Sequence, residues 1–195
     1  MLVGVIVARV GKLIYSFLAS LDGYIADRAG AFDWAVPDED VLDFINVAER
    51  EVGTYLYGRT MYEMMTGWEN DPAVAAQSPM SAEFAQIWQA AEKVVFSRSL
   101  DSVSTTRTRI ERTFDPGLVR DLKATTAKDL NVSGATLAAS AWKARLIDEC
   151  HLYLAPMLVG GGKRMFPDDI RHSLELLDER RFRNGMVFLR YAVKT

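Results

Sequence analysis

The sequence predicts an α/β domain with a mostly parallel central sheet and an antiparallel hairpin at its C-terminal edge. Short apolar runs rich in β-branched and aromatic residues alternate with segments of helical spacing, which is typical of βαβ units. Asn184-Gly185 stands between two β-rich runs, and this dipeptide predicts a hairpin turn. At four places an expected strand is followed at once by glycine, hydroxyl or charged residues. Parallel sheets bind their ligands at such strand ends.

The composition indicates one packed domain. The chain has 195 residues, of which 49% are hydrophobic, enough to bury a full core. We expect residues 12–195 to form this domain and residues 1–11 to be an N-terminal extension. The net charge of −3 argues against a nucleic-acid partner, which normally meets a basic face.

Membrane and metal-dependent classes are also disfavoured. Residues 2–8 and 13–21 are apolar, but each is shorter than the roughly 20 residues of a membrane span, so we expect no membrane contact. Cys150 is the single cysteine, which excludes an internal disulfide and a thiolate metal cluster and fits the reducing cytoplasm. Because no His-x-x-His or His-Glu-x-x-His spacing occurs, we expect no bound metal.

The first strand is expected at 12–19, an apolar run that ends before Asp22-Gly23. A glycine-containing loop then reaches Pro37. From Asp38 onward, apolar residues recur at helical spacing and acidic residues fill the first turn. This pattern predicts a helix that begins close to Asp38.

A short strand is expected at 53–57, and Thr60 and Glu63 then have the spacing of a capping box. The box predicts a helix beginning at Thr60, followed by a polar loop at 67–79. The same alternation continues to the C-terminal hairpin, with helices expected at 82–91, 117–126 and 135–146 and strands at 93–97, 107–113, 130–133 and 151–159. We interpret the basic run within 107–113 as a solvated strand edge.

Two of the expected helices begin directly after a strand with a glycine. Gly58-Arg59-Thr60 would let a ligand approach the backbone, and Arg59 would add a permanently charged phosphate contact. Ser133-Gly134-Ala135, with Thr136 in the same turn, repeats this arrangement after a later strand. A tight turn with an ordinary cap, or a close helix–strand crossing, would explain the same residues. A full Gly-x-Gly-x-x-Gly is absent, so the Rossmann signature does not apply.

Ser97 and Arg98 lie at the end of the strand expected at 93–97. A hydroxyl beside a guanidinium suits a monophosphate such as the 2′-phosphate of NADPH, although a polar strand end with a solvated arginine is the alternative. Gly160-Gly-Gly-Lys163 does not form a nucleotide-triphosphate P-loop. Met157 and Arg164 stand where that motif needs a glycine and a hydroxyl.

The candidates for proton chemistry are Asp22, Glu39 and Asp40. Reducing a C=N or C=O bond delivers hydride to carbon and a proton to the heteroatom, so a carboxylic acid or an ordered water must stand close. Asp22 ends the first strand and is expected to point toward the cleft. Glu39 and Asp40 open a helix, where acidic residues are also common for dipole reasons alone.

Taken in order, four motifs resemble the cofactor-binding elements of the dihydrofolate reductase fold. The resemblance is strongest to the branch that contains the reductase domain of the bifunctional riboflavin-biosynthesis deaminase/reductase, and it runs from about Lys12 to the end. The motifs are Ser20-Leu-Asp-Gly-Tyr-Ile-Ala26, Tyr57-Gly-Arg-Thr-Met-Tyr-Glu63, Val94-Val-Phe-Ser-Arg-Ser99 and Val132-Ser-Gly-Ala-Thr-Leu137.

The resemblance implies a three-layer fold that binds NADPH across the strand ends and reduces a small heterocycle such as a pteridine or an aminopyrimidine. Relatives in this branch tend to be homodimers, so a homodimer is expected as well. The positions that match the cofactor contacts are Leu18, Ile25 and Ala26 beside the nicotinamide, and Gly58, Arg59, Thr60, Ser97, Arg98, Ser133, Gly134 and Ala135 around the phosphates.

The chain departs from that branch in three ways. The double glycine that is common before the last cofactor helix is Ser133-Gly134 here. The zinc deaminase signature, His-x-Glu with Pro-Cys-x-x-Cys, is missing, so the chain is not the bifunctional enzyme. The acidic residue that folate reductases carry after Leu-Pro has no unique counterpart, because three acidic residues follow Pro37. The expectation is an NADPH-dependent reductase. A non-catalytic nucleotide-binding or assembly protein on the same fold is the alternative.

Overall fold

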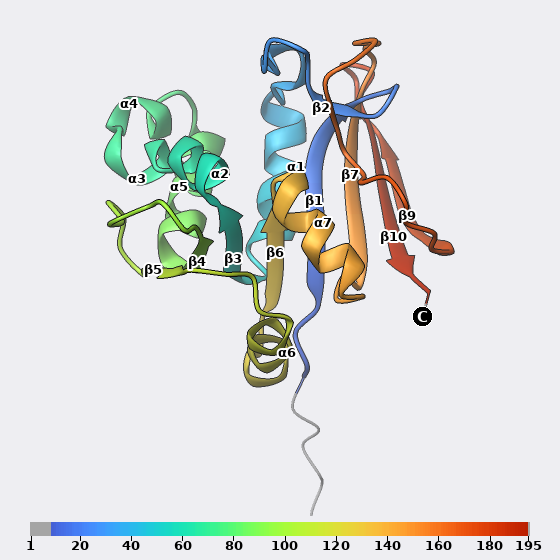
Figure 1. Cartoon of the computed structure of the whole chain (residues 1–195). Helices are drawn as coiled ribbons and strands as arrows, with labels where there is room; N and C mark the ends of the chain where they lie inside the picture. The colour runs from blue at the N-terminus through green and yellow to red at the C-terminus, as the bar shows by residue number, and fades with distance from the viewer. Residues whose placement is uncertain (1–8, 195) are drawn as a thin grey trace, which may run out of the picture.

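A twisted sheet of eight strands runs through the centre of the molecule (Figure 1). The computed structural model describes residues 9–194, so most of the expected N-terminal extension lies outside the described residues. The strands lie in the order β5-β4-β3-β6-β1-β7-β10-β9. Their bounds are β1 Leu13–Ser20, β3 Val52–Gly58, β4 Glu92–Phe96, β5 Thr108–Glu111, β6 Asp129–Ser133, β7 Glu149–Ala155, β9 Leu174–Arg181 and β10 Val187–Val193.

The first six of these strands in spatial order are parallel, and β10 is antiparallel to both β7 and β9. The hairpin predicted at Asn184-Gly185 is confirmed. Gly185 has a φ of 89°, and its amide donates to the Phe182 carbonyl at 3.2 Å. The predicted fold class, a mostly parallel sheet with an antiparallel C-terminal edge, is therefore correct.

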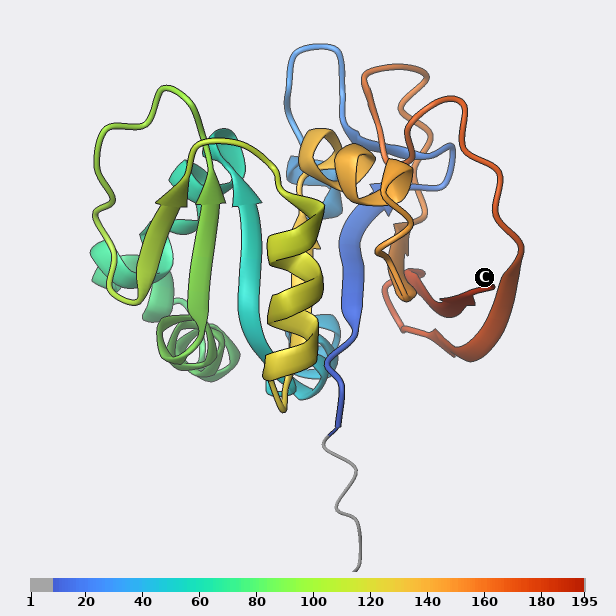
Figure 2. The same ribbon diagram turned by 60° about the horizontal axis from the view of Figure 1, so that its bottom comes forward.

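Helices cover both faces of the sheet (Figures 1 and 2). On one face, α1 (Glu39–Glu49) and α5 (Pro79–Ala90) bury apolar side chains against β3 and β7. On the other face, α6 (Pro116–Thr125) and α7 (Ala135–Lys143) pack over β1 and β6. Strands such as β4 alternate their side chains between the two clusters, because successive residues of a strand point to opposite faces. The result is the expected three-layer arrangement.

Two predictions for the segment after β3 are wrong. Helix α2 (Arg59–Met65) begins at Arg59 with Gly58 as its N-cap, and no side chain caps it, so Thr60 does not form a capping box. The stretch expected to be a loop at 67–79 contains two short helices, α3 (Gly67–Asn70) and α4 (Pro72–Ala75). In α4, Asp71 caps the first turn and Pro72 fills it, a combination that favours a helix start.

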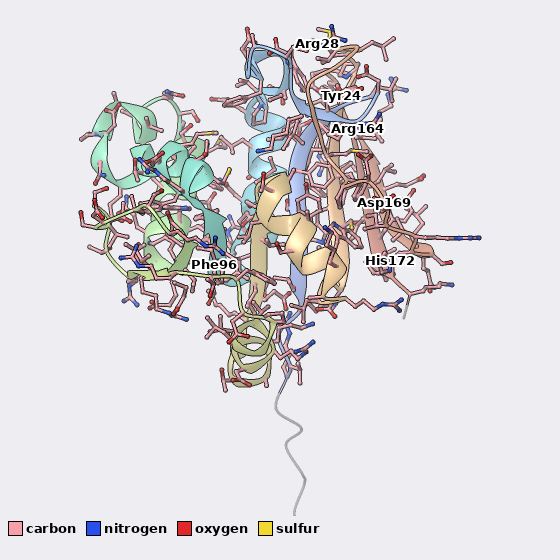
Figure 3. The ribbon with its side chains drawn as sticks, viewed as in Figure 1. Tyr24, Arg28, Phe96, Arg164, Asp169 and His172 are labelled. Carbon is pink, nitrogen blue, oxygen red and sulfur yellow. The ribbon has the colours of Figure 1, made fainter. Side chains whose placement is uncertain are left out.

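A second, smaller sheet lies across the C-terminal ends of β1 and β7. It pairs β2 (Tyr24–Ala26) with β8 (Lys163–Arg164), and the 3-10 helix η1 (Asp33–Ala35) follows β2. Figure 3 places Tyr24, Arg28 and Arg164 together in this region, while Phe96 at the end of β4 lies on the other side of the molecule. The small sheet therefore borders the strand ends from the β1 and β7 side.

Candidate nucleotide-binding site

The connections that follow the neighbouring strands β3 and β6 leave the sheet on opposite faces. The segments after β1 and β3 lead into α1 and α5 on one face, whereas the segment after β6 leads into α7 on the opposite face. Neighbouring strands whose connections leave to opposite faces open a crevice at their carboxyl ends. Gly58 ends β3 and Ser133 ends β6, so both predicted phosphate-binding turns lie at this crevice.

The ends of β4, β3 and β6 lie side by side. Gly58 is the register partner of Phe96 on β4, and Tyr57 is the partner of Ser133 on β6. Arg59 spans two of these ends, since its Nη1 donates to Ser99 Oγ at 3.0 Å while its Nε donates to Glu63 at 2.7 Å. The guanidinium is thus held beside the loop that follows β4.

That loop is organised by Ser97, whose buried hydroxyl oxygen accepts from the amides of Ser99 and Leu100 at 3.3 and 3.0 Å. Arg112 holds the loop from the other side by donating to the carbonyls of Ser97 and Leu100 at 3.3 and 2.7 Å. The sequence predicted a solvated basic strand edge for this region and contained no local signal that Arg112 would reach back to the loop. Arg98 itself is exposed.

The start of α7 leaves its amides available. Gly134 is the N-cap with a φ of 93°, and no side-chain acceptor caps the helix. Met61 of α2 lies close, 3.6 Å from where a Cβ on Gly134 would be, so the two helix starts face each other. Nothing lies within 4 Å of a Cβ position on Gly58, so that turn is open. Thr60 and Thr136 are exposed in the two first turns.

Asp22 lies at the end of β1 and holds a neighbouring loop. Its carboxylate accepts from Ser20 Oγ at 2.6 Å and from the amides of Gly160 and Val159 at 2.7 and 3.1 Å. The hydrogen bond from Ser20, followed by those from the Val159 and Gly160 amides, lowers the pKa of Asp22 to about 2. At neutral pH this carboxylate is ionised, so its surroundings favour a loop-holding role over proton donation.

The other two acidic candidates open α1. The cap of this helix is Asp38, which accepts from the Val41 amide at 3.1 Å. Asp40 pairs with Arg180 of β9 at 3.3 Å, so its side chain turns toward β9. Four strands, β6, β1, β7 and β10, lie between β9 and β3 in the sheet. Glu39 is exposed in the same turn.

Leu18, Ile25 and Ala26 border the strand ends from the β1 side. Leu18 is the register partner of Tyr153 on β7, and Ile25 and Ala26 belong to β2, which pairs with β8. All three are partly buried. The structure therefore brings the predicted phosphate contacts together at β4, β3 and β6, and the predicted nicotinamide contacts beside them at β1 and β2.

A hollow lies at the opposite, amino-terminal edge of the sheet. It has a volume of about 590 Å³, and its charged side chains already contact other groups. Arg50 pairs with Glu83, Arg107 pairs with Glu92, and Lys128 donates to the Arg50 carbonyl. A hollow whose charges are satisfied internally is a weaker ligand site than uncapped helix amides beside an exposed arginine.

Residues 9–194 contain neither a candidate membrane-spanning helix nor a candidate metal cluster. No helix there is long and apolar enough to cross a membrane. No group of three or more His, Cys, Asp or Glu side chains in that range is arranged to hold a metal ion.

Comparison with known families matches residues 11–188 to the RibD C-terminal domain family. The match extends from two residues before β1 into β10 and includes every strand end of the crevice. The chain belongs to the RibD C-terminal domain family. It is therefore a relative of the RibD reductase domain, as the four motifs predicted.

Relatives of this RibD-type chain match it over nearly its whole length. An uncharacterized protein, YyaP of Bacillus subtilis (strain 168), is 28% identical over 184 residues, which cover 92% of this chain and 94% of YyaP. A putative riboflavin biosynthesis protein from Shewanella sp. PV-4 is 24% identical, with a TM-score of 0.73 and coverage of 94% of this chain and 99% of that one.

A third relative carries a specific activity in its name. It is the diaminohydroxyphosphoribosylaminopyrimidine deaminase/5-amino-6-(5-phosphoribosylamino)uracil reductase of Thermotoga maritima, 12% identical, with a TM-score of 0.64. The similarity covers 94% of this chain but 57% of that protein. At this identity the likeness establishes the fold. Family membership supports an oxidoreductase-like enzyme related to the riboflavin pathway.

Proposed function

We propose that the protein is an NADPH-dependent reductase that transfers hydride to a small heterocycle of the pteridine or aminopyrimidine type. The observation that carries the proposal is the convergence of Arg59, Ser97-Arg98 and Gly134 at one topological switch point of the sheet. Separate turns that bind one ligand must end at the same crevice. These three do so on adjacent strands.

The residues at the crevice fit a phosphorylated dinucleotide. Uncapped amides at the start of α7 suit a pyrophosphate, and Arg59 is already held beside the same strand ends. Leu18 and β2 provide an apolar border on the β1 side for a planar ring. The cofactor would supply hydride when bound, while the chain supplies position and charge.

The preference for NADPH over NADH rests on the loop after β4. Ser97 accepts two amide hydrogen bonds and so keeps its hydroxyl hydrogen for a further acceptor, which a phosphate provides. Arg98 is exposed next to it and carries a permanent charge. Arg112 fixes this loop through two carbonyls, so it is a positioning residue for the phosphate contact.

The proton for the heteroatom has fewer candidate donors than the sequence suggested. The Asp22 carboxylate already accepts hydrogen bonds from the amides of residues 159 and 160, and the Asp40 carboxylate already pairs with Arg180. Glu39 or an ordered water remains for this role in the reductase. The occupied carboxylates also favour the second candidate function, a protein that binds the nucleotide without turnover.

Titration with NADPH and NADH tests the site, and the loss of NADPH absorbance against a panel of pterins and aminopyrimidines tests turnover. We expect tighter binding of NADPH than of NADH and oxidation with at least one substrate of the panel. Equal affinities would contradict the roles of Ser97 and Arg98. A folded protein that binds NADPH and turns over no substrate would favour the binding function.

We also propose that the protein forms a homodimer through β9. All eight residues of this edge strand are exposed, including Leu176 at 47%. An exposed edge strand with unpaired backbone groups invites pairing with another strand. When two copies of β9 run antiparallel with residue 174 opposite residue 181, Glu175 faces Arg180 twice and no like charges meet.

Light scattering on the purified protein tests the dimer. The substitution Glu175→Arg should weaken association by placing two arginines opposite each other, and the double variant Glu175→Arg/Arg180→Glu should restore it. A wild-type protein that stays monomeric at every concentration would contradict the proposal. A double variant that associates no better than the single one would contradict the register.

A further inference from the structure

A buried carboxyl group lies beneath the proposed cofactor site. Glu49 occupies the last turn of α1, and the residue is 7% exposed. One carboxyl oxygen accepts from the hydroxyl of Tyr55 on β3 at 2.8 Å, and the other accepts from Asn131 Nδ2 on β6 at 3.0 Å. Neither partner is basic, so a negative charge on Glu49 is stabilised by hydrogen bonds alone.

The contacts continue from Glu49 to the site. Asn131 Oδ1 accepts from the hydroxyl of Ser133 at 3.0 Å, and Ser133 is the last residue of β6. The next residue, Gly134, caps α7. Glu49 therefore connects through one carboxamide to the hydroxyl at the start of the proposed pyrophosphate-binding turn.

The direction of every hydrogen bond in this chain follows from the charge on Glu49. An ionised carboxylate can only accept, so it requires the Asn131 carboxamide to present its NH₂ group. The carboxamide oxygen then faces Ser133 and takes the hydroxyl hydrogen. In this state Ser133 has only lone pairs left to offer a ligand, and lone pairs repel a phosphate oxygen.

Protonation of Glu49 permits the reverse arrangement. A carboxylic acid donates one hydrogen bond, and the carboxamide accepts it after turning over, a change that leaves its shape the same. The NH₂ group of Asn131 would then donate to Ser133 Oγ, and the Ser133 hydrogen would be released. Tyr55 still donates to the second carboxyl oxygen. All four side chains are satisfied in both arrangements, so the chain has two states.

We infer that Glu49 is a positioning residue whose protonation reverses the Glu49–Asn131–Ser133 chain and frees the Ser133 hydroxyl to donate to an anionic ligand. The inference rests on the proposed function, because it names the cofactor phosphate as that ligand. Binding of the phosphate favours the state with protonated Glu49. The protein therefore takes up a proton when it binds the nucleotide at a pH where Glu49 is ionised.

The surroundings place this change near neutral pH. Burial raises the pKa of Glu49 to about 7, against the opposing effect of its hydrogen bonds from Tyr55 and Asn131. The titratable side chains around it are Tyr55 and Tyr57 on β3 and Tyr153 on β7. Burial raises the pKa of each of these hydroxyls above its ordinary value, so none of them titrates near neutral pH. Nearby charged groups have partners of their own. Arg50, at the end of α1, pairs with Glu83, and Glu149 of β7 pairs with His151, Arg190 and Lys12.

Calorimetric titration with NADPH between pH 6 and 8.5, in buffers of different ionisation enthalpy, measures the linked proton. Above pH 7 we expect the wild-type dissociation constant to rise up to tenfold per pH unit relative to the Glu49→Gln variant. Glutamine keeps a neutral group that donates to Asn131, so this variant should bind at every pH as the wild type does at pH 6. Titration of the ligand's own phosphate is common to both proteins and cancels in the comparison.

Two further variants separate a relay from a local structural effect. Ser133→Ala keeps Glu49 but removes the end of the chain, so it should abolish the proton uptake. Glu51→Gln removes an exposed carboxylate two residues away and should behave as the wild type. Identical pH dependence in the wild type and Glu49→Gln would overturn the inference, as would full proton uptake in Ser133→Ala.

Nuclear magnetic resonance of the ligand-free protein tests the reversal independently of any cofactor. The side-chain amide protons of Asn131 should show nuclear Overhauser contacts to the side chains of Glu49 and Tyr55 at pH 8.5, and to the β protons of Ser133 at pH 6. If no nicotinamide nucleotide bound at any pH, the proposed function would fail, and these contacts would still decide the relay. Contacts that stay the same across the titration would overturn it.

Discussion

Arg59 and Arg98 are both expected to contact phosphate, but their contacts within the protein differ. Arg59 is held by Glu63 and Ser99, so its side chain is ordered before a ligand arrives. Arg98 is exposed next to a hydroxyl that the loop has fixed in place. The first arrangement suits a contact common to all dinucleotides, and the second suits a contact to the one group that differs between NADPH and NADH.

Arg98→Ala should therefore weaken NADPH binding selectively. A charge-assisted hydrogen bond contributes about 1.5–3 kcal/mol, less at an exposed position, so we expect a loss of roughly tenfold for NADPH and little change for NADH. Fluorescence titration of both nucleotides against both proteins measures this. Arg59→Ala is the matched comparison and should weaken the two nucleotides alike. Equal losses from Arg98→Ala would remove the 2′-phosphate contact.

At the scale of single elements, the sequence predicted those that depend on local pattern. The spacing of Val41 and Ile45 predicted α1, and the same spacing continued by four residues gives Glu49, so the sequence contained a signal that this carboxyl group is buried. The hairpin at Asn184-Gly185 was likewise a local signal. The helix start at Thr60 was wrong by one residue, because Gly58 took the cap position without a side-chain hydrogen bond.

Elements that depend on distant contacts could not be predicted. The pairing of β2 with β8 joins residues more than 130 positions apart, and both strands are too short to show a period. Arg112 reaches the loop after β4 only because β5 runs beside β4. The positions that lie at the crevice were thus predictable where a turn follows a strand, and unpredictable where tertiary packing brings a side chain to that turn.

The glycine loop before β8 shows how closely these distant segments pack. Gly162 has a φ of 133°, and a Cβ there would lie 2.1 Å from the Ala26 carbonyl oxygen of β2. Gly162→Ala should therefore lower the free energy of unfolding by more than about 2 kcal/mol or displace β2 from β8. Gly160→Ala is the control, since nothing lies within 4 Å of its Cβ position, and it should cost about 1 kcal/mol. Urea denaturation of both variants measures the difference, and equal losses would contradict the close approach.

At the scale of the whole molecule, β9 forms one edge of the eight-stranded sheet. The sheet buries both faces of its parallel strands under helices, but β9 exposes every one of its residues at one edge. The proposed dimer would continue the sheet through that edge, so the crevice at β3 and β6 would remain open in each protomer. Association and nucleotide binding should accordingly be independent, and Glu175→Arg should leave the dissociation constant for NADPH unchanged while it weakens the dimer.

The buried Glu49 makes the stability of the whole fold depend on pH. Its pKa is raised from 4.5 to about 7 in the folded protein, so between these values the folded state binds more protons than the unfolded state. The free energy of unfolding should fall as the pH rises through this window, by about 3 kcal/mol in total, and the contribution of Glu49 should be constant above and below it. Glu49→Gln has no proton to lose. Urea denaturation at pH 5 and pH 8 should therefore show the variant gaining stability relative to the wild type at pH 8, because a neutral amide avoids the cost of a buried charge. A constant difference between the two proteins at both pH values would show that Glu49 does not titrate in this range.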